Sequence, residues 1–228
     1  MHHGLGCAYG IFKAGRRFVG KTVGIAGEHL TGAEMAAAIG GMTQCVGVDV
    51  GSEDSVRGAF DTIRQVHPVI DILVNNAGKF VPKPFSDTTE ADFDALMNLH
   101  AKGPYFAMQE AAKVLSERGR IVNISSAGTQ LHYYGATAYL GSRGALEQFT
   151  QGVAQELAPR GITVNTVAPG FTDTGILTDA YKKMGIEASP FKRLGTPQDI
   201  AEVVAFLVSE QARWVTGQTI QAGGGIVM

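Results

Sequence analysis

Short apolar runs alternate with longer amphipathic stretches along the whole chain. We expect strands at 23–26, 45–48, 70–74, 121–124, 162–167 and 218–221, and helices at 31–39, 52–63, 90–116, 139–157 and 197–208. Apolar runs of this length predict buried strands, and apolar residues at helical spacing predict amphipathic helices. Strands that alternate with helices indicate a parallel sheet with helices on both faces. The expected fold class is therefore α/β, a doubly wound parallel sheet forming a single domain over residues 1–228.

The composition narrows the possible functions. A chain of 228 residues suits one α/β domain, and a hydrophobic content of 45% is ample for its core. The net charge of −2 gives no reason to expect a nucleic-acid or membrane partner. Cys7 and Cys45 have neither metal nor redox spacing, and no apolar run reaches the ~18 residues of a membrane-spanning helix. The first residues contain no signal-peptide core, so we expect a cytoplasmic protein without a metal site.

Three side chains have a spacing that suits carbonyl chemistry. Tyr139 lies thirteen residues after Ser126 and four residues before Arg143. On a helix, positions i and i+4 share a face, which places a phenol beside a fixed positive charge. Ser126 follows the apolar run 121–124, and ligands of parallel sheets bind at the carboxyl ends of strands. A carbonyl group fits between the two hydroxyls at such a place.

A second motif, Asn75-Asn76-Ala77-Gly78, directly follows another apolar run. Small residues there allow the backbone to approach a flat ligand, and the asparagine amides can tie neighbouring strands together. Taken alone, the motif fits a glycine-terminated turn equally well. Together with Ser126 and Tyr139, it indicates a binding site for a flat ligand.

These motifs together resemble the short-chain dehydrogenase/reductase family, and most closely its 3-oxoacyl-carrier-protein reductase-like members. The resemblance covers residues 4–228 and also includes Asp49-Val50, Pro169–Thr174, Arg193–Pro197, Val215–Gln218 and Gly223–Gly225. It implies a Rossmann-like fold, a nicotinamide cofactor, and interconversion of a ketone and a secondary alcohol by hydride transfer. The segment 174–190 is short and largely apolar, which favours a small or medium carbonyl or alcohol substrate.

The resemblance assigns catalytic roles. Tyr139 is the expected acid/base, and Ser126 the residue that orients the carbonyl. Ser125 is its rival by residue type, but the thirteen-residue spacing favours Ser126. A free tyrosine has a pKa of roughly 10, and an adjacent cation favours the phenolate. Arg143 is expected to supply that charge and to bond the nicotinamide ribose.

Two residues depart from the family pattern. Arg143 replaces a lysine; an arginine keeps the charge but does not relay a proton, so we expect reduced turnover. His100 stands where the family has an asparagine that anchors a water relay. Two interpretations of His100 remain open, a satisfied structural residue or a water-binding relay that titrates near neutral pH.

The resemblance also implies how the cofactor is held. Asp49 would bond the adenine ring, although alone it fits a simple helix-entry residue. The backbone at Thr172 and the hydroxyl of Thr174 would hold the nicotinamide amide. The implied cofactor-binding residues are Gly4, Gly10, Asp49, Val50, Asn76, Ala77, Gly78, Tyr139, Arg143, Pro169, Gly170, Thr172 and Thr174.

The N-terminal region departs most from the family pattern, and two alignments are possible. In the preferred one, Gly4, Ala8 and Gly10 form the phosphate loop, 23–26 is the second strand, and the first strand is missing from the centre of the sheet. In the alternative, 23–27 is the first strand, with no glycine loop after it. Three explanations of this N-terminal region remain open: an incomplete start, an eroded cofactor site, or a partner subunit that supplies the missing sheet edge.

The remaining expectations concern cofactor choice, assembly and activity. The choice between NAD and NADP depends on the charges near the end of the strand at 23–26. Only Glu28 lies just beyond that strand, and Arg16 and Arg17 lie before it, so NADP is slightly favoured over NAD. Two helices, one through Met108 and one through Leu146, resemble the pair that packs between subunits in the family, which implies a homodimer or homotetramer. The alternative function is a catalytically silent member of the fold that binds a ligand or an oligomer partner.

Overall fold

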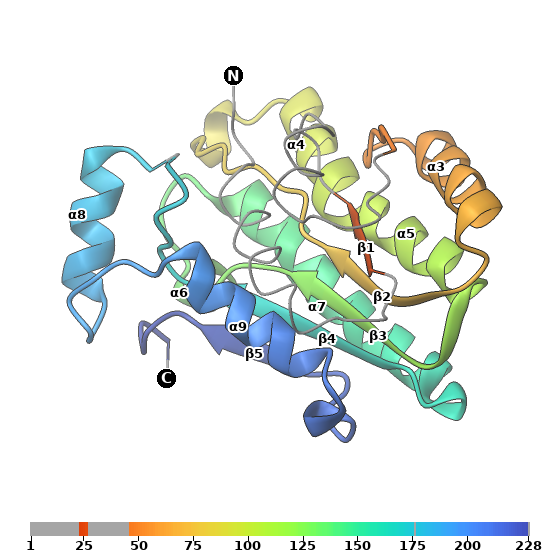
Figure 1. The fold of residues 1–228 in the computed structure, drawn as a ribbon. Coiled ribbons are helices and arrows are strands. Elements are labelled where there is room, and N and C mark those ends of the chain that lie inside the picture. The colour runs from red at the N-terminus through yellow and green to blue at the C-terminus, as the bar shows by residue number, and fades with distance from the viewer. Residues whose placement is uncertain (1–22, 27–45, 176, 228) are drawn as a thin grey trace.

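The computed structural model describes residues 23–26, 46–175 and 177–227 (Figure 1). The strands are β1 (Val23–Ala26), β2 (Ile70–Asn75), β3 (Leu115–Ile124), β4 (Thr163–Pro169) and β5 (Thr219–Ala222). The helices are α3 (Glu53–Val66), α4 (Glu90–Met97), a π-helical turn (Asn98–Lys102), α5 (Gly103–Ala112), α6 (Gly128–Leu131), α7 (Thr137–Leu157), α8 (Asp179–Ala188) and α9 (Pro197–Leu207). Short 3₁₀ turns lie at Phe85–Asp87, Ala158–Arg160 and Glu210–Ala212.

The described strands form one parallel sheet in the order β1-β2-β3-β4-β5. Helices α5 and α7 cover one face of the sheet and α9 covers the other, as Figure 1 shows. A parallel sheet needs crossover connections, and helices that cover both faces bury its apolar residues on both sides. The predicted α/β architecture is confirmed.

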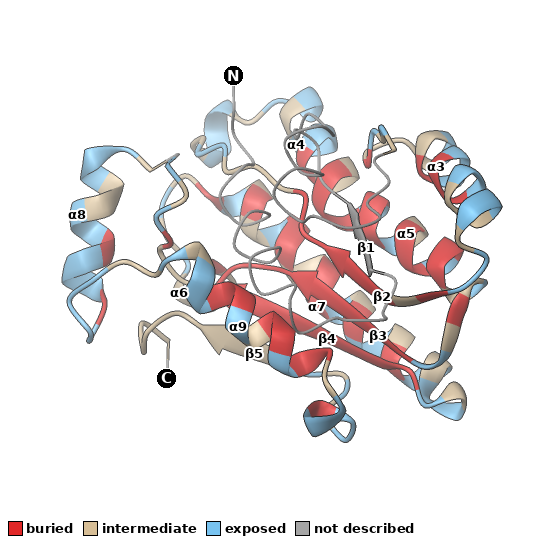
Figure 2. Cartoon of the chain, in the orientation of Figure 1, coloured by how far each residue is buried: buried red, intermediate tan, exposed pale blue. Residues whose placement is uncertain are grey.

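Two apolar cores, one on each face, follow from the alternation of side chains along the strands (Figure 2). In β2, Ile72 and Val74 pack against α9 together with Val204. Leu73 points the other way and packs with Met108 of α5. The carboxyl-terminal parts of β2 and β3 are buried on both faces, and residues 70–74 and 121–124 are apolar except for Asp71 and Asn123, which is why these strands could be predicted. β4 is also buried but mixes apolar residues with threonine and asparagine.

Two predicted elements differ from the structure. Residues 46–48 form no strand; they lead into a turn in which the Asp49 carboxylate accepts the Gly51 N–H at 2.9 Å, before Ser52 caps α3. The helix expected over 90–116 ends at Ala112 instead. Its last predicted residues belong to β3, which starts at Leu115 because that residue pairs with Ile70 of β2.

The position of β1 corrects the preferred N-terminal alignment. β1 pairs directly with β2 in parallel, with Val23 opposite Ile72 and Ala26 opposite Asn75. Because these backbones are hydrogen-bonded neighbours, no strand lies between them, and the placement of 23–26 beyond a missing central strand is wrong. Gly4, Gly10 and the predicted helix at 31–39 lie outside the described residues, so the phosphate loop stays a prediction.

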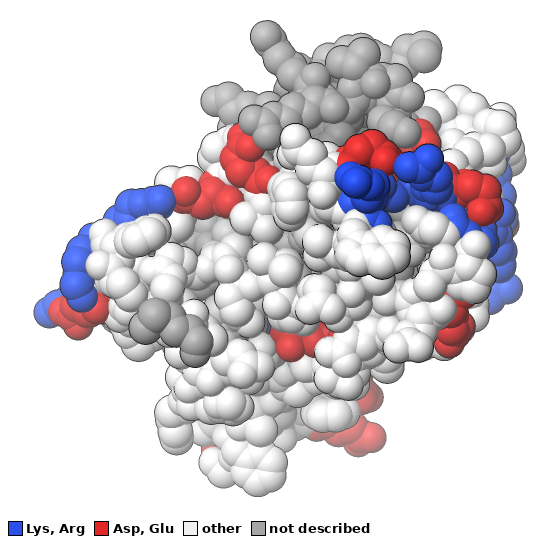
Figure 3. Space-filling view, turned by 90° about the horizontal axis from the view of Figure 1, so that it is seen from below, with Lys and Arg blue, Asp and Glu red and all other residues white. Residues whose placement is uncertain are grey.

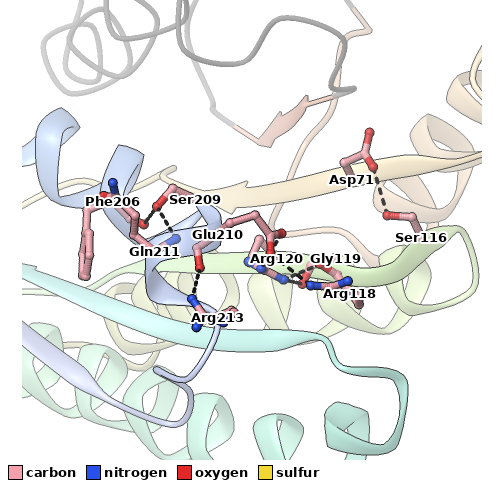
Figure 4. Close-up of polar contacts among 10 residues, drawn as sticks. All are labelled: Asp71, Ser116, Arg118, Gly119, Arg120, Phe206, Ser209, Glu210, Gln211 and Arg213. Atoms are coloured by element: carbon pink, nitrogen blue, oxygen red, sulfur yellow. Dashed lines mark hydrogen bonds and ion pairs between the residues drawn. The ribbon is translucent and has the colours of Figure 1, made fainter.

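A polar cluster fixes the amino-terminal half of β3 (Figure 4). Arg118 adopts a left-handed conformation with φ of 61°, and its guanidinium lies 3.1 Å from Glu210. The buried Arg120 reaches the other oxygen of the same carboxylate, also at 3.1 Å. Ser116 donates a hydrogen bond to Asp71 of β2 at 3.0 Å. These contacts join β2, β3 and the segment after α9, so they support the fold.

Within the ranges that the structure describes, no helix has the length and apolarity needed to cross a bilayer. The longest, α7, has 21 residues, and its buried positions include the polar residues Ser142, Arg143 and Glu147. Those side chains face the interior of the domain, where α7 packs against β4.

Candidate active site

Asparagine amides lock the carboxyl ends of β2 and β3 in place. Asn75 Nδ2 donates to Asn123 Oδ1 at 2.8 Å, and Asn123 Nδ2 donates to Thr150 Oγ1 of α7 at 2.9 Å. Asn75 and Asn123 are also opposite each other in the strand register. The prediction that an asparagine of this motif ties neighbouring strands is confirmed. These paired side chains fix the two strand ends beneath the site.

A cleft opens at the carboxyl ends of β2, β3 and β4, where ligands of parallel sheets bind. It is open to solvent and spans about 1030 Å³, open solvent included. The sequence-predicted residues that line it are Asn76, Gly78, Ser126, Tyr139, Arg143, Pro169, Gly170, Thr172 and Thr174. Segments far apart in the sequence thus converge on one place.

Other predicted residues lie away from this cleft. Val50 and Ala77 are buried together in a small apolar cluster with Leu99. Asp49 is exposed, and its carboxylate accepts a backbone N–H in the turn before α3. Gly4 and Gly10 are outside the described residues. The role of Asp49 toward an adenine ring therefore stays a prediction, while its helix-entry role is seen directly.

Ser126 and Ser125, the two rival serines, have different hydrogen-bond partners. Ser126 Oγ accepts the Gly128 N–H at 3.1 Å and also interacts with the Tyr133 hydroxyl, which lines the cleft. Ser125 Oγ instead donates to Glu147 Oε1 at 2.6 Å, so its hydrogen is committed. These partners favour Ser126 as the donor toward the cleft, in agreement with the spacing argument.

The guanidinium of Arg143 occupies the space that Gly78 leaves open. A Cβ atom at Gly78 would lie only 2.0 Å from Arg143 Nη2, so a side chain at this position would displace the guanidinium. Arg143 Nη1 donates to the Ile124 carbonyl at 2.7 Å, and its Cζ lies 5.6 Å from the centroid of the Tyr139 ring. The i,i+4 spacing on α7 predicted the proximity of Tyr139 and Arg143, but the contact with Gly78 is non-local and had no sequence signal.

His100 lies behind the cleft and is completely buried, with both ring nitrogens in hydrogen bonds. Ser142 Oγ donates to the Tyr139 carbonyl at 2.7 Å, so it accepts from His100 Nδ1–H at 2.9 Å. His100 Nε2 then accepts the Lys79 N–H at 3.1 Å. Burial, with Arg143 and Lys79 nearby, lowers the pKa of His100 to about 2. The expectation that it titrates near neutral pH is wrong, because the site holds the neutral ring.

This burial makes a pH-dependent contribution to stability. The pKa of His100 falls from its ordinary value of 6.5 to about 2 on folding, so below pH 6.5 the unfolded chain binds the proton that the folded chain refuses. His100 therefore destabilises the fold progressively as the pH falls from 6.5 toward 2. Between about pH 7.5 and about pH 5.5, we expect His100 to cost about 1 kcal/mol, or roughly 2–4 °C in Tm.

Thermal unfolding of the wild type and of His100→Asn at both pH values tests this contribution. The fall in Tm on acidification should be smaller in the variant by the amount just given. An equal fall in both proteins would show that His100 is not held neutral by the fold.

The loop after β4 is joined to the loop that precedes α9. Thr172 and Gly195 form a parallel bridge, with Gly195 N–H donating to the Phe171 carbonyl at 2.9 Å. Arg193 binds both carboxylate oxygens of Asp199, at 2.7 and 3.0 Å, and this contact holds the pKa of Asp199 well below its usual range. The segment 193–197, which leads into α9, thus also fixes one wall of the cleft.

Several aromatic residues of the cleft were missed from the sequence. Phe80 and Tyr133 line it but were not among the candidates. Of the apolar residues in the segment 174–190, from which the substrate size was predicted, Leu177 and Tyr181 line the cleft, whereas Met184 and Ile186 are about 40% exposed and do not. The aromatic residues come from separate segments, so no local pattern could reveal that they meet.

Comparison with known proteins gives a consistent result. A family model described as enoyl-(acyl carrier protein) reductase matches residues 4–227. A 3-oxoacyl-[acyl-carrier-protein] reductase of Aquifex aeolicus is 37% identical over 198 residues, which are 85% of this chain and 80% of the relative. The match thus extends over nearly the whole chain.

Solved structures share the fold at high similarity. A short-chain dehydrogenase/reductase from Serratia marcescens superposes with a TM-score of 0.88 at 28% identity, covering 98% of this chain and 95% of that one. The landomycin C-6 ketoreductase LanV, solved with bound NADP and rabelomycin, gives a TM-score of 0.85 at 35% identity, covering 98% and 92%.

Proposed function

The chain belongs to the short-chain dehydrogenase/reductase family, and we propose that it uses NADPH to reduce a ketone to a secondary alcohol. The observation that carries the proposal is the convergence of Ser126, Tyr139 and Arg143 on one cleft at the strand ends. A hydroxyl donor, a phenol and a fixed cation are what the conversion of a carbonyl to an alcohol requires. The reductase and the NADP-bound ketoreductase among its relatives support the same reaction.

The residues present fit a nicotinamide cofactor. Asn76 Oδ1 and Arg143 Nε are buried without a hydrogen-bond partner among the described residues, and both residues line the cleft. Buried polar atoms of this kind are costly unless a ligand or water satisfies them. Asn76, Gly78, Arg143 and the segment 169–174 would hold the nicotinamide half. When bound, the reduced cofactor supplies a hydride to the carbonyl carbon.

The protein's own groups would manage the carbonyl oxygen. Ser126 would donate a hydrogen bond to that oxygen and stabilise the negative charge that develops there. Tyr139 would deliver the proton that completes the alcohol. Arg143 would stabilise the phenolate that remains, through its charge near the ring. His100, with Ser142, would act as a positioning residue, because this pair bonds the Tyr139 carbonyl and holds the first turn of α7.

Arg143→Lys is expected to raise kcat by about 3–10-fold, because an ammonium group can exchange protons and a guanidinium cannot. The gain should appear in steady-state ketone reduction at saturating NADPH. Arg57→Lys, on the exposed surface of α3, is the matched control and should leave kcat unchanged. Equal rates for wild type and Arg143→Lys would remove the argument that the arginine limits proton supply.

Cofactor binding is tested by fluorescence titration of the protein with NADPH and, in parallel, with NADH. Saturable micromolar binding, tighter for NADPH, is the expected result. Tighter binding of NADH would reverse the cofactor preference and leave the reductase proposal standing. No binding of either cofactor up to millimolar concentration would contradict the proposal and favour a catalytically silent member of the family.

We also propose a homodimer or homotetramer that works in the cytoplasm on a small-molecule substrate. Tyr105 is 40% exposed on α5, and its ring meets Phe149 of α7 at 5.2 Å, so these two helices share an outward aromatic face. Met108 and Leu146 on the same helices are fully buried in the chain's own core, so they take no part in such a contact. Light scattering of the purified protein would give the subunit number.

A further inference from the structure

Aromatic rings form one wall of the cleft beside Tyr139. The ring of Phe80 lies at the centre and meets three tyrosine rings edge to face, with centroid distances of 5.1 Å to Tyr139, 5.5 Å to Tyr181 and 6.4 Å to Tyr133. Tyr133 in turn lies 6.3 Å from Phe171. We call Phe80, Tyr133, Phe171 and Tyr181 the aromatic wall. Its members come from the loop after β2, the loop after α6, the loop after β4, and α8.

Close contacts with glycines hold the aromatic wall in position. A Cβ atom at Gly185 of α8 would lie 2.5 Å from Phe171 Cβ, so the helix sits directly on that ring. A Cβ atom at Gly128 would lie 2.4 Å from the Tyr133 hydroxyl, so this tyrosine lies against the backbone after Ser126. Burial raises the pKa of Tyr133, and its hydroxyl interacts with the side chain of Ser126. The wall is therefore built into the fold.

The wall still presents ring surface to the cleft. All four side chains are only partly buried, although each contacts other rings, and Leu131 and Leu177 extend the apolar lining. Partly covered apolar surface in a cleft is completed by an apolar ligand. Aromatic rings attract further rings in edge-to-face or offset geometry beyond the effect of burial alone, which favours a flat aromatic group over a saturated one.

Lys79 and Arg143 line the cleft itself, but the segment on its α8 side offers a polyanionic carrier no excess of positive charge. Residues 173–199, which include α8, carry four acidic and four basic side chains and so have no net charge. The basic ones are largely paired: Lys182 lies 3.3 Å from Asp173, and Arg193 binds Asp199. At the α8 end of the molecule, Figure 3 shows blue and red side chains next to each other. Phosphate groups or an acidic carrier protein would be better served by an excess of positive charge.

We propose that this site takes a free aromatic ketone, whose carbonyl is bonded directly to a flat aromatic ring or belongs to a ring fused to one. Such a ketone would be preferred to a thioester carried on coenzyme A or an acyl carrier protein. The proposal rests on the proposed ketone reductase activity and names the substrate class for it. The aromatic wall would bind the ring of the substrate and thereby direct its carbonyl toward Tyr139.

The test uses a matched set of substrates with wild-type protein and NADPH: 1-tetralone, its saturated analogue 1-decalone, and acetoacetyl-coenzyme A. The expected kcat/KM for 1-tetralone is at least about 10-fold above that for each of the others. Equal or better reduction of 1-decalone or acetoacetyl-coenzyme A would overturn the aromatic substrate class and leave the reductase function standing. No turnover of any of the three would count against both.

A pair of variants tests the wall itself. Tyr181→Leu removes a ring on α8 without touching Tyr139, and Phe80→Leu removes the central ring. Each should lower the ratio of kcat/KM for 1-tetralone to that for 1-decalone by about 3–10-fold. Phe85→Leu, a phenylalanine that is 79% exposed and does not line the cleft, is the control and should leave the ratio unchanged. An unchanged ratio in both wall variants would overturn the proposal.

Discussion

Tyr139→Phe is expected to lower kcat for ketone reduction by about 10²–10⁴-fold, the usual contribution of a positioned general acid. The substitution removes only the hydroxyl, the one group in the cleft proposed to deliver a proton to the substrate. Because the reaction would then depend on solvent for that proton, kcat should fall far more than the affinity for NADPH.

The fold should tolerate this change. The Tyr139 ring keeps its edge-to-face contacts with Phe80 and His100 at 5.1 and 5.5 Å, and phenylalanine preserves them. NADPH titration and thermal unfolding should therefore match the wild type. Tyr134→Phe makes the same chemical change on a side chain that is 87% exposed, and it should leave kcat unaltered. Retained turnover in Tyr139→Phe would show that the proton comes from elsewhere.

Ser126→Ala is expected to lower kcat by about 10²–10³-fold, the range seen when one donor to a developing oxyanion is removed. Ser126 Oγ accepts the Gly128 N–H and has the Tyr133 hydroxyl beside it, so it lies at the cleft, where a substrate oxygen can take its hydrogen. Steady-state kinetics with a saturating ketone would show the loss mainly in kcat, because the interaction strengthens as charge develops.

Ser125→Ala is the matched control for this change. The Ser125 hydroxyl bonds the buried carboxylate of Glu147 at 2.6 Å, so its removal should cost stability, about 1–3 kcal/mol, with a small effect on kcat. Thermal unfolding and kinetics measured on both variants separate the two roles. If Ser125→Ala lost more turnover than Ser126→Ala, the assignment of the carbonyl-orienting serine would have to be exchanged.

The main features of the fold could be predicted because the central strands are buried on both faces. Residues 70–74 and 121–124 are apolar at all but one position each, and 162–167 mixes Ile and Val with Thr and Asn; short runs of this kind indicate buried strands. The catalytic candidates followed from spacing within single segments: Tyr139 and Arg143 share one face of α7, and Ser126 ends a strand. Patterns within single segments therefore predicted both the sheet and the residues at the centre of the site.

The features that could not be predicted depend on contacts that apolar spacing along the sequence does not reveal. The π-helical turn at 98–102 depends on a bond from the Gly103 N–H to the Asn98 carbonyl, which leaves no trace in apolar spacing. The contact of Gly78 with Arg143 joins residues 65 positions apart in the sequence. The neutral state of His100 depends on its complete burial beside Lys79 and Arg143, whereas its sequence suggested a residue that titrates.

The N-terminal strand shows the same limit. Its apolar character predicted that 23–26 forms a strand, but strand order in a sheet depends on which backbones pair. The direct pairing of β1 with β2 placed it beside Ile70–Asn75, against the preferred alignment. Sequence pattern alone could not distinguish two positions in the same sheet, because both would be equally apolar.

The central claim is that this cleft reduces a ketone with Tyr139 as the proton donor. The most direct measurement is NADPH consumption by wild type and Tyr139→Phe, side by side, with 1-tetralone as the ketone. We expect steady ketone-dependent consumption by the wild type and a loss of at least about 10²-fold in the variant, with NADPH binding retained in both. Equal consumption by the two proteins, or no ketone-dependent consumption by a wild type that binds NADPH, would contradict the account.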